Sequence, residues 1–252
     1  MSNLLTLQKV RKSFGNLMAV YDVSLTIPQG QIIGLIGPNG SGKSTLLNVI
    51  SATLPADSGA VIFDGQDITG RPTDEVFKLG LVRSFQDPSL FFKMTVLDNA
   101  LLPVKKQRGE TPWWAPFHRF WRKQETEQAL ASGKLLAQLQ LRNHYATLAS
   151  DLSGGQMKLL ELGRSLMGAP RLLLLDEPTA GVAPKLAYAI FEQIEQMRQS
   201  LGLTFLIVEH RLEILFDFVD SLYVMHLGQV IAKGTPAEIS ANAEVREIYF
   251  GE

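Results

Sequence analysis

The chain has 252 residues, of which 46% are hydrophobic and 19% charged, so it can bury a substantial core as one large domain or as one domain with an embedded subdomain. Its 24 basic and 25 acidic residues give a formal net charge of −1, which argues against a dedicated nucleic-acid-binding protein. The absence of cysteine excludes disulfides, thiol catalysis and cysteine-ligated metals.

The first part of the sequence predicts strands and one helix. Apolar and polar residues alternate over Leu4–Val10 and Val20–Ile27, as in half-buried strands. The apolar run Gln31–Ile36 ends in glycines and predicts a buried strand, and Lys43–Ser51 predicts a helix after it. The uncharged stretch 23–42 contains too many Gly and Pro residues for a membrane-spanning helix, and the N-terminus lacks a signal-peptide pattern. We therefore expect a soluble chain, which another subunit would have to carry to any membrane.

The middle of the sequence has a different pattern. Helical spacing occurs in Val96–Leu102, Gln124–Leu139 and Gln156–Met167, and no strong strand is evident from about residue 87 to residue 167. Strands and helices alternate again afterwards, in Arg171–Leu175, Pro184–Ser200, Thr204–Val208 and Arg211–Phe218. This order predicts an α/β core with a helical subdomain inserted at about 87–167.

A phosphate-binding loop is predicted between the buried strand at 31–36 and the helix after it. Residues 37–44 read GPNGSGKS and match the pattern G-x-x-x-x-G-K-[ST], which occurs by chance in roughly one sequence in a hundred of this length. Lys43 can reach the β- and γ-phosphates, the Ser44 hydroxyl can bind magnesium, and Thr45 is expected near the α-phosphate. The expected phosphate-binding residues are Gly37, Pro38, Asn39, Gly40, Ser41, Gly42, Lys43, Ser44 and Thr45.

Two carboxylates follow the apolar run Leu172–Leu175. A strand ending here delivers Asp176 and Glu177 to the sheet edge where open α/β sheets bind ligands. Asp176 is expected to hold magnesium, directly or through water, and Glu177 to orient and polarise the attacking water. Alone, the pair also fits a strand that ends in solvated acids. Together with a phosphate-binding loop, it predicts a site for ATP and Mg²⁺.

A second anion-binding helix end is predicted at Leu152–Gln156, which reads LSGGQ. Ser153 can cap the helix that follows, while Gly154 and Gly155 expose backbone N–H groups, and Gln156 completes the motif. The chain then has two phosphate-binding helix ends and one phosphate-binding loop. We infer that the second end completes the nucleotide site of a partner chain.

With these motifs the sequence resembles the ATP-binding cassette ATPases over essentially its whole length. Leu152–Gln156 is similar to the signature peptide of that family, and Gln86, Asp176 and His210 follow its order. The resemblance implies a P-loop NTPase (RecA-like) core with an antiparallel β-subdomain. It also implies that Gln86 contacts magnesium, that His210 contacts the γ-phosphate and that Phe14 stacks on adenine. The expected catalytic residues are Glu177, His210, Lys43 and Gln86, and the expected metal ligands are Ser44, Gln86 and Asp176.

Neither Phe14 nor His210 would be chosen without the resemblance, since a core phenylalanine and a surface histidine explain them as well. Two positions depart from the family pattern. Ala183 stands where many members have an aspartate that crosses the dimer interface, and Arg211 replaces an acid often found after the histidine. Communication between two nucleotide sites is therefore expected to be weaker or asymmetric.

Within the family, the chain most resembles ATPase subunits of branched-chain amino acid importers, through segments 65–70, 82–86, 90–96 and 245–251. Urea importers and lipopolysaccharide-export ATPases share parts of this pattern. The resemblance implies membrane permease subunits, a second identical or different ATPase and, indirectly, a solute-binding protein as partners, at the cytoplasmic face of the membrane. A soluble non-transport cassette protein is the alternative, but such proteins usually have two cassettes or a long coiled coil.

Residues 105–123 contain all three tryptophans of the chain. The aromatic residues are Trp113, Trp114, Phe117, Phe120 and Trp121, and the basic ones are Lys105, Lys106, Arg108, Arg119, Arg122 and Lys123. Aromatic and basic residues together suit a protein interface or a surface near anionic headgroups. The alternative is an aromatic staple that packs on the helical subdomain itself.

Overall fold

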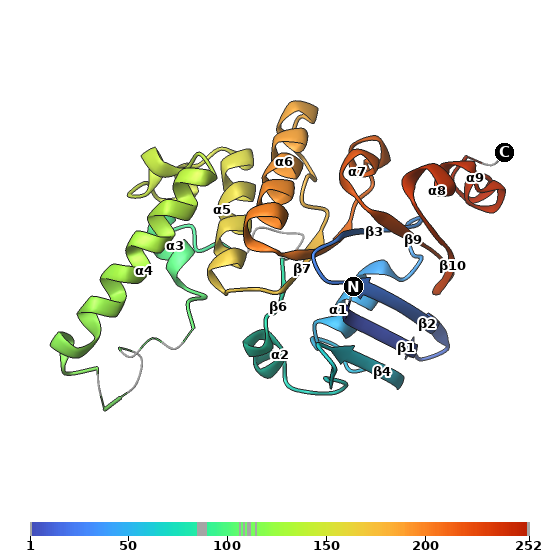
Figure 1. The fold of residues 1–252 in the computed structure, drawn as a ribbon, viewed down its shortest axis with the longest axis horizontal. Coiled ribbons are helices and arrows are strands. Elements are labelled where there is room, and N and C mark those ends of the chain that lie inside the picture. The colour runs from blue at the N-terminus through green and yellow to red at the C-terminus, as the bar shows by residue number, and fades with distance from the viewer. Residues whose placement is uncertain are drawn as a thin grey trace.

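A six-stranded sheet runs through the middle of the computed structural model, with strand order β10-β9-β3-β8-β7-β6 (Figure 1). The structure describes residues 2–84, 90–105, 107, 109, 112, 113 and 115–250. The strands of this sheet are β3 (Ile32–Ile36), β6 (Leu81–Arg83), β7 (Leu172–Asp176), β8 (Thr204–Val208), β9 (Ser221–His226) and β10 (Gln229–Gly234). Only β10 is antiparallel to its neighbour in this sheet. Every residue of β3, β7 and β8 is buried, which explains their uninterrupted apolar sequences.

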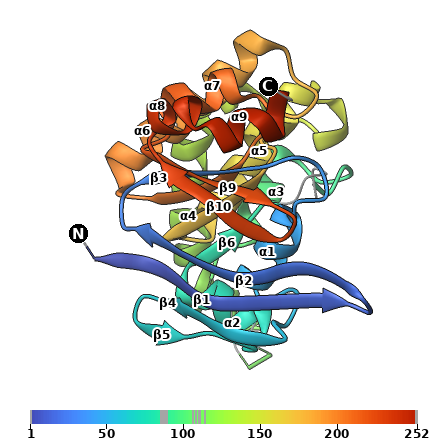
Figure 2. The same ribbon diagram turned by 90° about the vertical axis from the view of Figure 1, so that its right-hand side faces the viewer.

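A second, antiparallel sheet has the order β2-β1-β4-β5 and lies below the first in Figure 2. Its strands are β1 (Asn3–Phe14), β2 (Leu17–Pro28), β4 (Ser58–Phe63) and β5 (Gln66–Asp67). The two predicted strands at 4–10 and 20–27 are confirmed, and both are longer because they form one hairpin. Gly15 has φ 58° in its turn, a conformation that glycine adopts without strain. This sheet is the antiparallel β-subdomain that the resemblance implies.

Helices cover both faces of the six-stranded sheet. Helix α1 (Lys43–Ile50) packs Leu46 and Leu47 into the core that the two sheets share. On the opposite face lie α6 (Pro184–Leu201) and α7 (Leu212–Phe218), which contribute Phe191 and Leu215 to the second core. Figure 2 shows this layered order, with the helices above the larger sheet and the smaller sheet below it.

Among the described residues between β6 and β7, the α-helices are α3 (Val96–Leu101), α4 (His118–Gln138) and α5 (Gly154–Met167). They lie at one end of the molecule, on the left of Figure 1. Helix α2 (Thr73–Leu79) precedes β6. Helix α4 begins six residues before the predicted Gln124, so part of the aromatic segment forms its first turns. The sequence prediction began later because the helical spacing of apolar residues becomes recognisable only after these first turns.

The C-terminal segment adds α8 (Pro236–Ala241) and α9 (Ala243–Phe250) beside α7. Thr235 begins α8 with reciprocal hydrogen bonds: its Oγ1 accepts from the N–H of Glu238 at 3.4 Å, and its own N–H donates to Glu238 Oε2 at 2.7 Å. Among the described residues, no helix combines the length and apolar character needed to span a membrane.

Candidate nucleotide site

The phosphate-binding loop is held between the backbones of β2 and β9, which belong to different sheets. A Cβ atom at Gly37 would lie 2.2 Å from the carbonyl oxygen of Met225, and one at Gly42 would lie 2.2 Å from that of Ala19. These distances are too short for any side chain, so glycine is required at both positions. Gly40 has φ 79° and no neighbouring atom within 4 Å of a built Cβ, so this turn is open. The loop therefore combines fixed ends with an accessible middle.

Lys43 lies at the first turn of α1 with its side chain along the loop. Its ammonium donates to the carbonyl oxygens of Gly37 at 2.8 Å and Pro38 at 3.0 Å. Burial lowers the pKa of Lys43, while the negative charges of Glu177 and Asp176 act in the opposite direction. Lys43 is 6% exposed. A phosphate would supply the anionic partner that a buried ammonium requires.

Further polar groups of the loop fit a phosphate ligand. The hydroxyl of Ser41 is buried and has no hydrogen-bond partner among the described residues. Ser44 is exposed and Thr45 half-buried in the first turn of α1, so both hydroxyls lie at its N-terminal end. Within the described part of the chain, no three His, Asp or Glu side chains gather into a metal site. A magnesium ion here would take its ligands from Ser44, Asp176, phosphate and water, as Mg²⁺ commonly does.

The two predicted carboxylates occupy different environments at the end of β7. Asp176 is 4% exposed, and its Oδ2 accepts a hydrogen bond from Arg83 Nη2 at 3.0 Å. Arg83 also donates to the side-chain oxygen of Asn48 on α1. Glu177 has φ 50°, and its N–H donates to the carbonyl oxygen of Val208 at 2.9 Å. Asp176 is therefore held inside the sheet edge, while Glu177 turns out of it.

Glu177 and His210 come together although they are far apart in sequence. His210 Nε2 lies 3.1 Å from Glu177 Oε1. The histidine follows β8, and the glutamate follows the adjacent parallel strand β7. Because both side chains remain partly exposed, they can contact a water or a phosphate.

Glu209 is a functional candidate that the sequence reading missed. It is 3% exposed. Its Oε1 accepts from the N–H and hydroxyl of Thr179, the N–H at 3.0 Å. Its Oε2 accepts from the N–H groups of His210 at 2.8 Å and Arg211 at 3.3 Å. This buried carboxylate therefore ties the loop after Glu177 to the histidine segment. The sequence feature that could have indicated this role is an acidic residue placed between a buried strand and His210.

The two departures from the family pattern lie near this connection. Arg211 Nη2 donates to the carbonyl oxygen of Val182 at 2.8 Å, so the side chain that replaces an acid holds the loop before α6. Ala183 is exposed and precedes α6 without a side-chain cap. This loop is held from within the chain by Arg211 and Glu209.

The signature segment begins α5. Ser153 Oγ accepts from the N–H of Gln156 at 3.4 Å, and Gln156 Oε1 accepts from the N–H of Ser153 at 2.9 Å. Gln156 Nε2 also lies 3.1 Å from His144 Nε2. Ser153 and Gly154 are exposed. Gly155 is buried, and a Cβ there would lie 2.0 Å from Leu186 Cδ2. The helix end is thus capped by its own residues and open towards solvent.

Phe14 and Gln86 are the two remaining residues expected to contact the nucleotide or its metal ion. Phe14 ends β1 and is 50% exposed, so it is not a core phenylalanine. The ammonium of Lys12 lies 5.9 Å from the centroid of its ring. Gln86, expected at the magnesium ion, falls outside the described residues.

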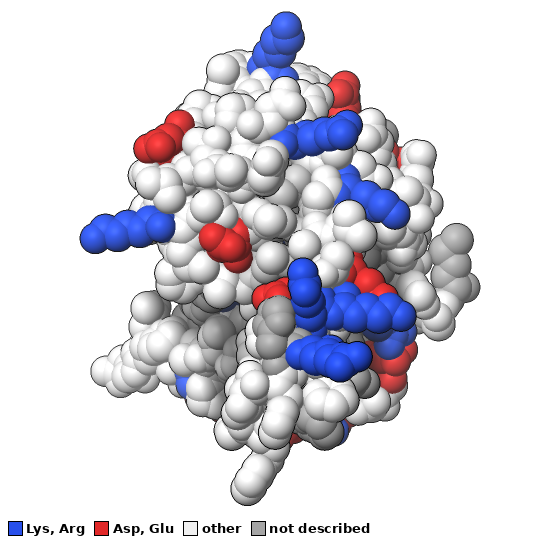
Figure 3. All heavy atoms as spheres, turned by 90° about the vertical axis from the view of Figure 1, so that its left-hand side faces the viewer, with Lys and Arg blue, Asp and Glu red and all other residues white. Residues whose placement is uncertain are grey.

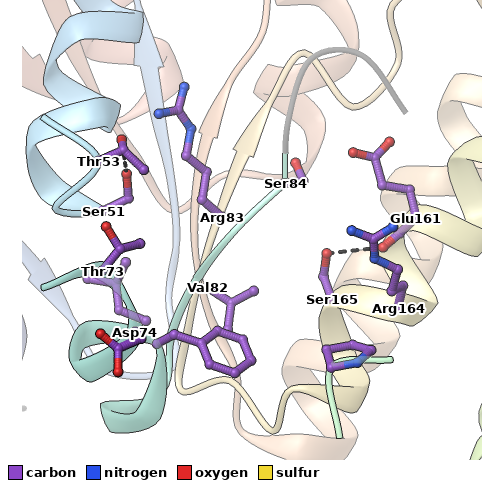
Figure 4. A pocket seen from close by; sticks show the side chains of 13 residues that line it. Ser51, Thr53, Thr73, Asp74, Val82, Arg83, Ser84, Glu161, Arg164 and Ser165 are labelled. Atoms are coloured by element: carbon purple, nitrogen blue, oxygen red, sulfur yellow. Dashed lines mark hydrogen bonds between the residues drawn. The ribbon is translucent and has the colours of Figure 1, made fainter. Parts of the chain in front are cut away.

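A groove of about 500 Å³ lies between the core and α5 (Figure 4). Thr53 and Thr73 line it on the core side, and Arg164 and Ser165 line it on α5. Arg83, the residue that holds the carboxylate at the end of β7, extends from β6 between the two walls. Arg83 therefore connects the groove with the candidate magnesium site.

The loop around a buried lysine, followed by two carboxylates at the carboxyl end of a parallel strand, defines a P-loop nucleotide-binding protein. A family model described as ABC transporter matches residues 20–180. The chain belongs to the ABC transporter family. A second model, described as branched-chain amino acid ATP-binding cassette transporter, matches residues 229–252.

Similar proteins cover nearly the whole chain. It is 44% identical to the probable branched-chain amino acid transport ATP-binding protein LivG of Methanocaldococcus jannaschii, over 99% of this chain and 98% of that protein. The solved ADP conformation of an ATP-binding cassette of an ABC transporter is 42% identical, with TM-score 0.86 and 100% of both chains covered. A dimeric post-hydrolysis cassette bound to ADP and phosphate is 25% identical, with TM-score 0.76 over 92% of this chain and 98% of that one. As an ABC ATPase, the chain binds nucleotide and hydrolyses ATP.

Proposed function

We propose that this chain energises the uptake of branched-chain amino acids or related small polar solutes, as a peripheral subunit at the cytoplasmic face of the cell membrane. The observation that carries the proposal is the 44% identity over 99% of the chain to a protein named for branched-chain amino acid transport. The C-terminal match at residues 229–252 supports the same group. The ATPase does not itself touch the transported solute, so kinship is the argument for the substrate class.

The proposed hydrolysis gives each group of the site a separate role. Lys43 holds the β- and γ-phosphates, with the N–H groups of the loop around it. Glu177 orients a water molecule for attack, and His210, 3.1 Å from it, contacts the γ-phosphate. Bound Mg²⁺ supplies charge neutralisation on the phosphate oxygens, and Ser44, Asp176 and Gln86 are its proposed protein ligands. Phe14 is exposed enough to stack on adenine.

The second half of each site is proposed to come from another chain. Ser153 and Gly154 are exposed at the capped N-terminus of α5, which suits a phosphate on a facing subunit. A dimeric cassette structure of the same family supports this arrangement. The second ATPase is either an identical or a different chain. Closure on ATP and opening after hydrolysis would drive the membrane subunits.

The permease subunits are proposed to dock on the helices between β6 and β7, which we treat as a subdomain of about residues 87–167. The groove in Figure 4 offers a concave surface, and Arg83 links it to Asp176. Figure 3 views the molecule from this end and shows a group of Lys and Arg side chains just below the middle, next to acidic side chains, while other Lys and Arg side chains are scattered over the upper half. Trp113 is 83% exposed, and Phe117 and Phe120 are also exposed, with their ring centroids 6.3 Å apart. Exposed aromatic clusters of this kind favour contact with a partner or with headgroups.

The aromatic segment also contains a staple. Trp121 is half-buried, and its indole N–H donates to the carbonyl oxygen of Ala115 at 3.3 Å. A Cβ at Gly109 would lie 3.3 Å from its ring. Trp121 therefore packs on its own segment, while Trp113 is the better candidate for docking. Trp114 lies outside the described residues.

Copurification from membranes followed by reconstitution tests the proposed function. The chain should copurify with integral permease subunits. The reconstituted complex should take up labelled leucine only when ATP and Mg²⁺ are supplied. A complex that moves urea or lipopolysaccharide and not leucine would contradict the substrate class. A chain that is found without any membrane subunit would favour the soluble alternative.

A further inference from the structure

The hairpin of β1 and β2, which crosses the lower half of Figure 2, brings the end of β1 close to the phosphate-binding loop. Ser13 pairs with Met18 across this hairpin, and Phe14 is the next residue of β1. The residue after Met18 is Ala19, whose carbonyl oxygen would lie 2.2 Å from a Cβ atom at Gly42 of the loop. The exposed ring of Phe14 is therefore carried by the same strand pair that holds the loop in place.

Asp57, the residue before β4, binds two consecutive residues of β1. Its Oδ1 accepts from the ammonium of Lys12 at 2.6 Å, and its Oδ2 accepts from the N–H and the hydroxyl of Ser13, both at 2.7 Å. The hydrogen bonds from Lys12 and Ser13 lower the pKa of Asp57 to about 2, so this carboxyl group is ionised at physiological pH. The N–H of Asp57 also donates to the carbonyl oxygen of Arg11 at 2.9 Å. Asp57 therefore fixes the end of β1 immediately before Phe14.

Lys12 connects this anchor to the aromatic ring. Its ammonium lies 5.9 Å from the centroid of the Phe14 ring, within the range of a cation–π interaction. The side chain of Lys12 is 12% exposed, whereas Phe14 is 50% exposed. Because the ammonium occupies one side of the ring, the other side is available for stacking. A ring that is already held in one orientation loses less conformational freedom when a ligand stacks on it.

We propose that Lys12 is a positioning residue for the nucleotide: held by Asp57, it fixes the Phe14 ring on which the adenine base stacks. The stacking role of Phe14 belongs to the proposed function, and this inference rests on it. Lys12 acts through the ring and contributes to binding of the base, whereas Lys43 and the loop bind the phosphates. A change at Lys12 should therefore distinguish a nucleotide from a phosphate chain that has no base.

Calorimetric titration of the purified full chain with ADP and with inorganic pyrophosphate, both in the presence of Mg²⁺, tests this distinction. In Lys12→Met, which keeps the apolar stem and removes the charge, the Kd for ADP should rise about 3-fold, the scale of one exposed cation–π contact. The Kd for pyrophosphate should not change. Lys78→Met is the matched control, because Lys78 also forms an ion pair of 2.6 Å, with Asp74 on α2, and its loss should change neither Kd.

Two results of this titration would overturn the inference. An unchanged ADP affinity in Lys12→Met would show that the ammonium does not support base binding. An equal loss of ADP and pyrophosphate affinity would show that Lys12 acts on the phosphates or on the whole site, and not on the base.

A double-mutant cycle tests whether Lys12 acts through the ring. Phe14→Leu keeps an apolar side chain and removes the ring, so the Kd for ADP should rise about 10-fold, within the range of base stacking on an aromatic side chain. Adding Lys12→Met to Phe14→Leu should weaken ADP binding no further, since the ring that Lys12 positions is absent. A further 3-fold loss in the double variant would contradict the inference.

The outcomes separate this inference from the proposed function. A Phe14→Leu chain that binds ADP as the wild-type chain does would refute the stacking role of Phe14, and this inference with it. If Phe14→Leu loses ADP affinity and Lys12→Met does not, only the positioning role of Lys12 is refuted. Neither result bears on which solute the transporter carries.

Discussion

Two helix N-termini of the chain, those of α1 and α5, suit phosphate, and they are built in opposite ways. At α1, the loop is held between the backbones of Ala19 and Met225, and Lys43 is 6% exposed. At α5, Ser153 and Gly154 are exposed, and the cap is made by the helix's own residues. The first end is preorganised inside the chain. The second is an exposed helix end that its own residues already cap. This arrangement suits contact with a nucleotide bound to another subunit.

Glu177→Gln has the largest expected effect of the substitutions at the α1 end, a loss of ATP hydrolysis. The amide retains size and hydrogen bonding but cannot act as a base, so ATP hydrolysis should fall about 1,000-fold, within the range of general-base catalysis. ATP binding should survive, because Lys43 and the loop are unchanged. Phosphate release and nucleotide binding measure the two effects. Glu192→Gln, on the exposed side of α6, is the matched control. Wild-type turnover in Glu177→Gln would remove the role given to this carboxylate.

Lys43→Ala tests whether the buried ammonium is needed for binding. Removing its charge should weaken ATP binding by about 100-fold, the cost of losing one preorganised charged contact. The fold should persist, because the hydrogen bonds of Lys43 go to the loop carbonyls of Gly37 and Pro38 and not to a distant element. Circular dichroism and nucleotide titration are the measurements. Near-normal ATP affinity in a folded variant would refute the assignment of the loop.

Gly154→Asp tests the α5 end. A Cβ at Gly154 meets no atom within 4 Å, whereas one at Gly155 would press on Leu186, so Gly154 is the cleaner position for an added carboxylate. The negative charge would repel a phosphate on the facing chain, and hydrolysis should fall about 10-fold. ATP binding to the same monomer should not change. Gly154→Ser is the uncharged control and should retain most of the activity. A folded Gly154→Asp monomer that fails to bind ATP would contradict the two-chain site.

Local sequence patterns predicted the strands that are buried along their whole length. Strands β3, β7 and β8 are buried at every position and appear as apolar runs. By contrast, β6 has three residues and β10 has no buried residue, so backbone pairing with β7 and β9 defines them. No periodicity in the sequence reports that pairing.

The site residues also fall into those that a continuous motif reveals and those that only the fold brings together. The phosphate-binding loop, Asp176–Glu177 and the signature segment are continuous motifs that the sequence shows. Arg83 lies 93 positions from Asp176, and Glu209 lies 30 positions from Thr179. Their roles depend on which strand ends are adjacent, and the fold must be known before those contacts can be identified.

The smallest expected effects concern the aromatic segment. Trp121→Ser removes a half-buried ring and should destabilise the isolated chain by about 1–2 kcal/mol, while Trp113→Ser, at a site 83% exposed, should change stability by less than about 0.5 kcal/mol. Trp113→Ser should instead weaken copurification with the permease subunits. Thermal melting and pull-down of both variants separate these effects. A Trp113→Ser chain that melts early and still assembles normally at low temperature would refute the docking role.

The most direct test of the two-chain site is to mix Lys43→Ala with Gly154→Asp. Each variant alone should have little ATPase activity. In a mixed pair, the intact loop of one chain faces the intact signature of the other, so one of the two sites is complete. If the chains exchange freely, half of the pairs are mixed and activity should recover to about a quarter of the wild-type value. If each site were built within a single chain, mixing would restore nothing beyond the sum of the two separate activities.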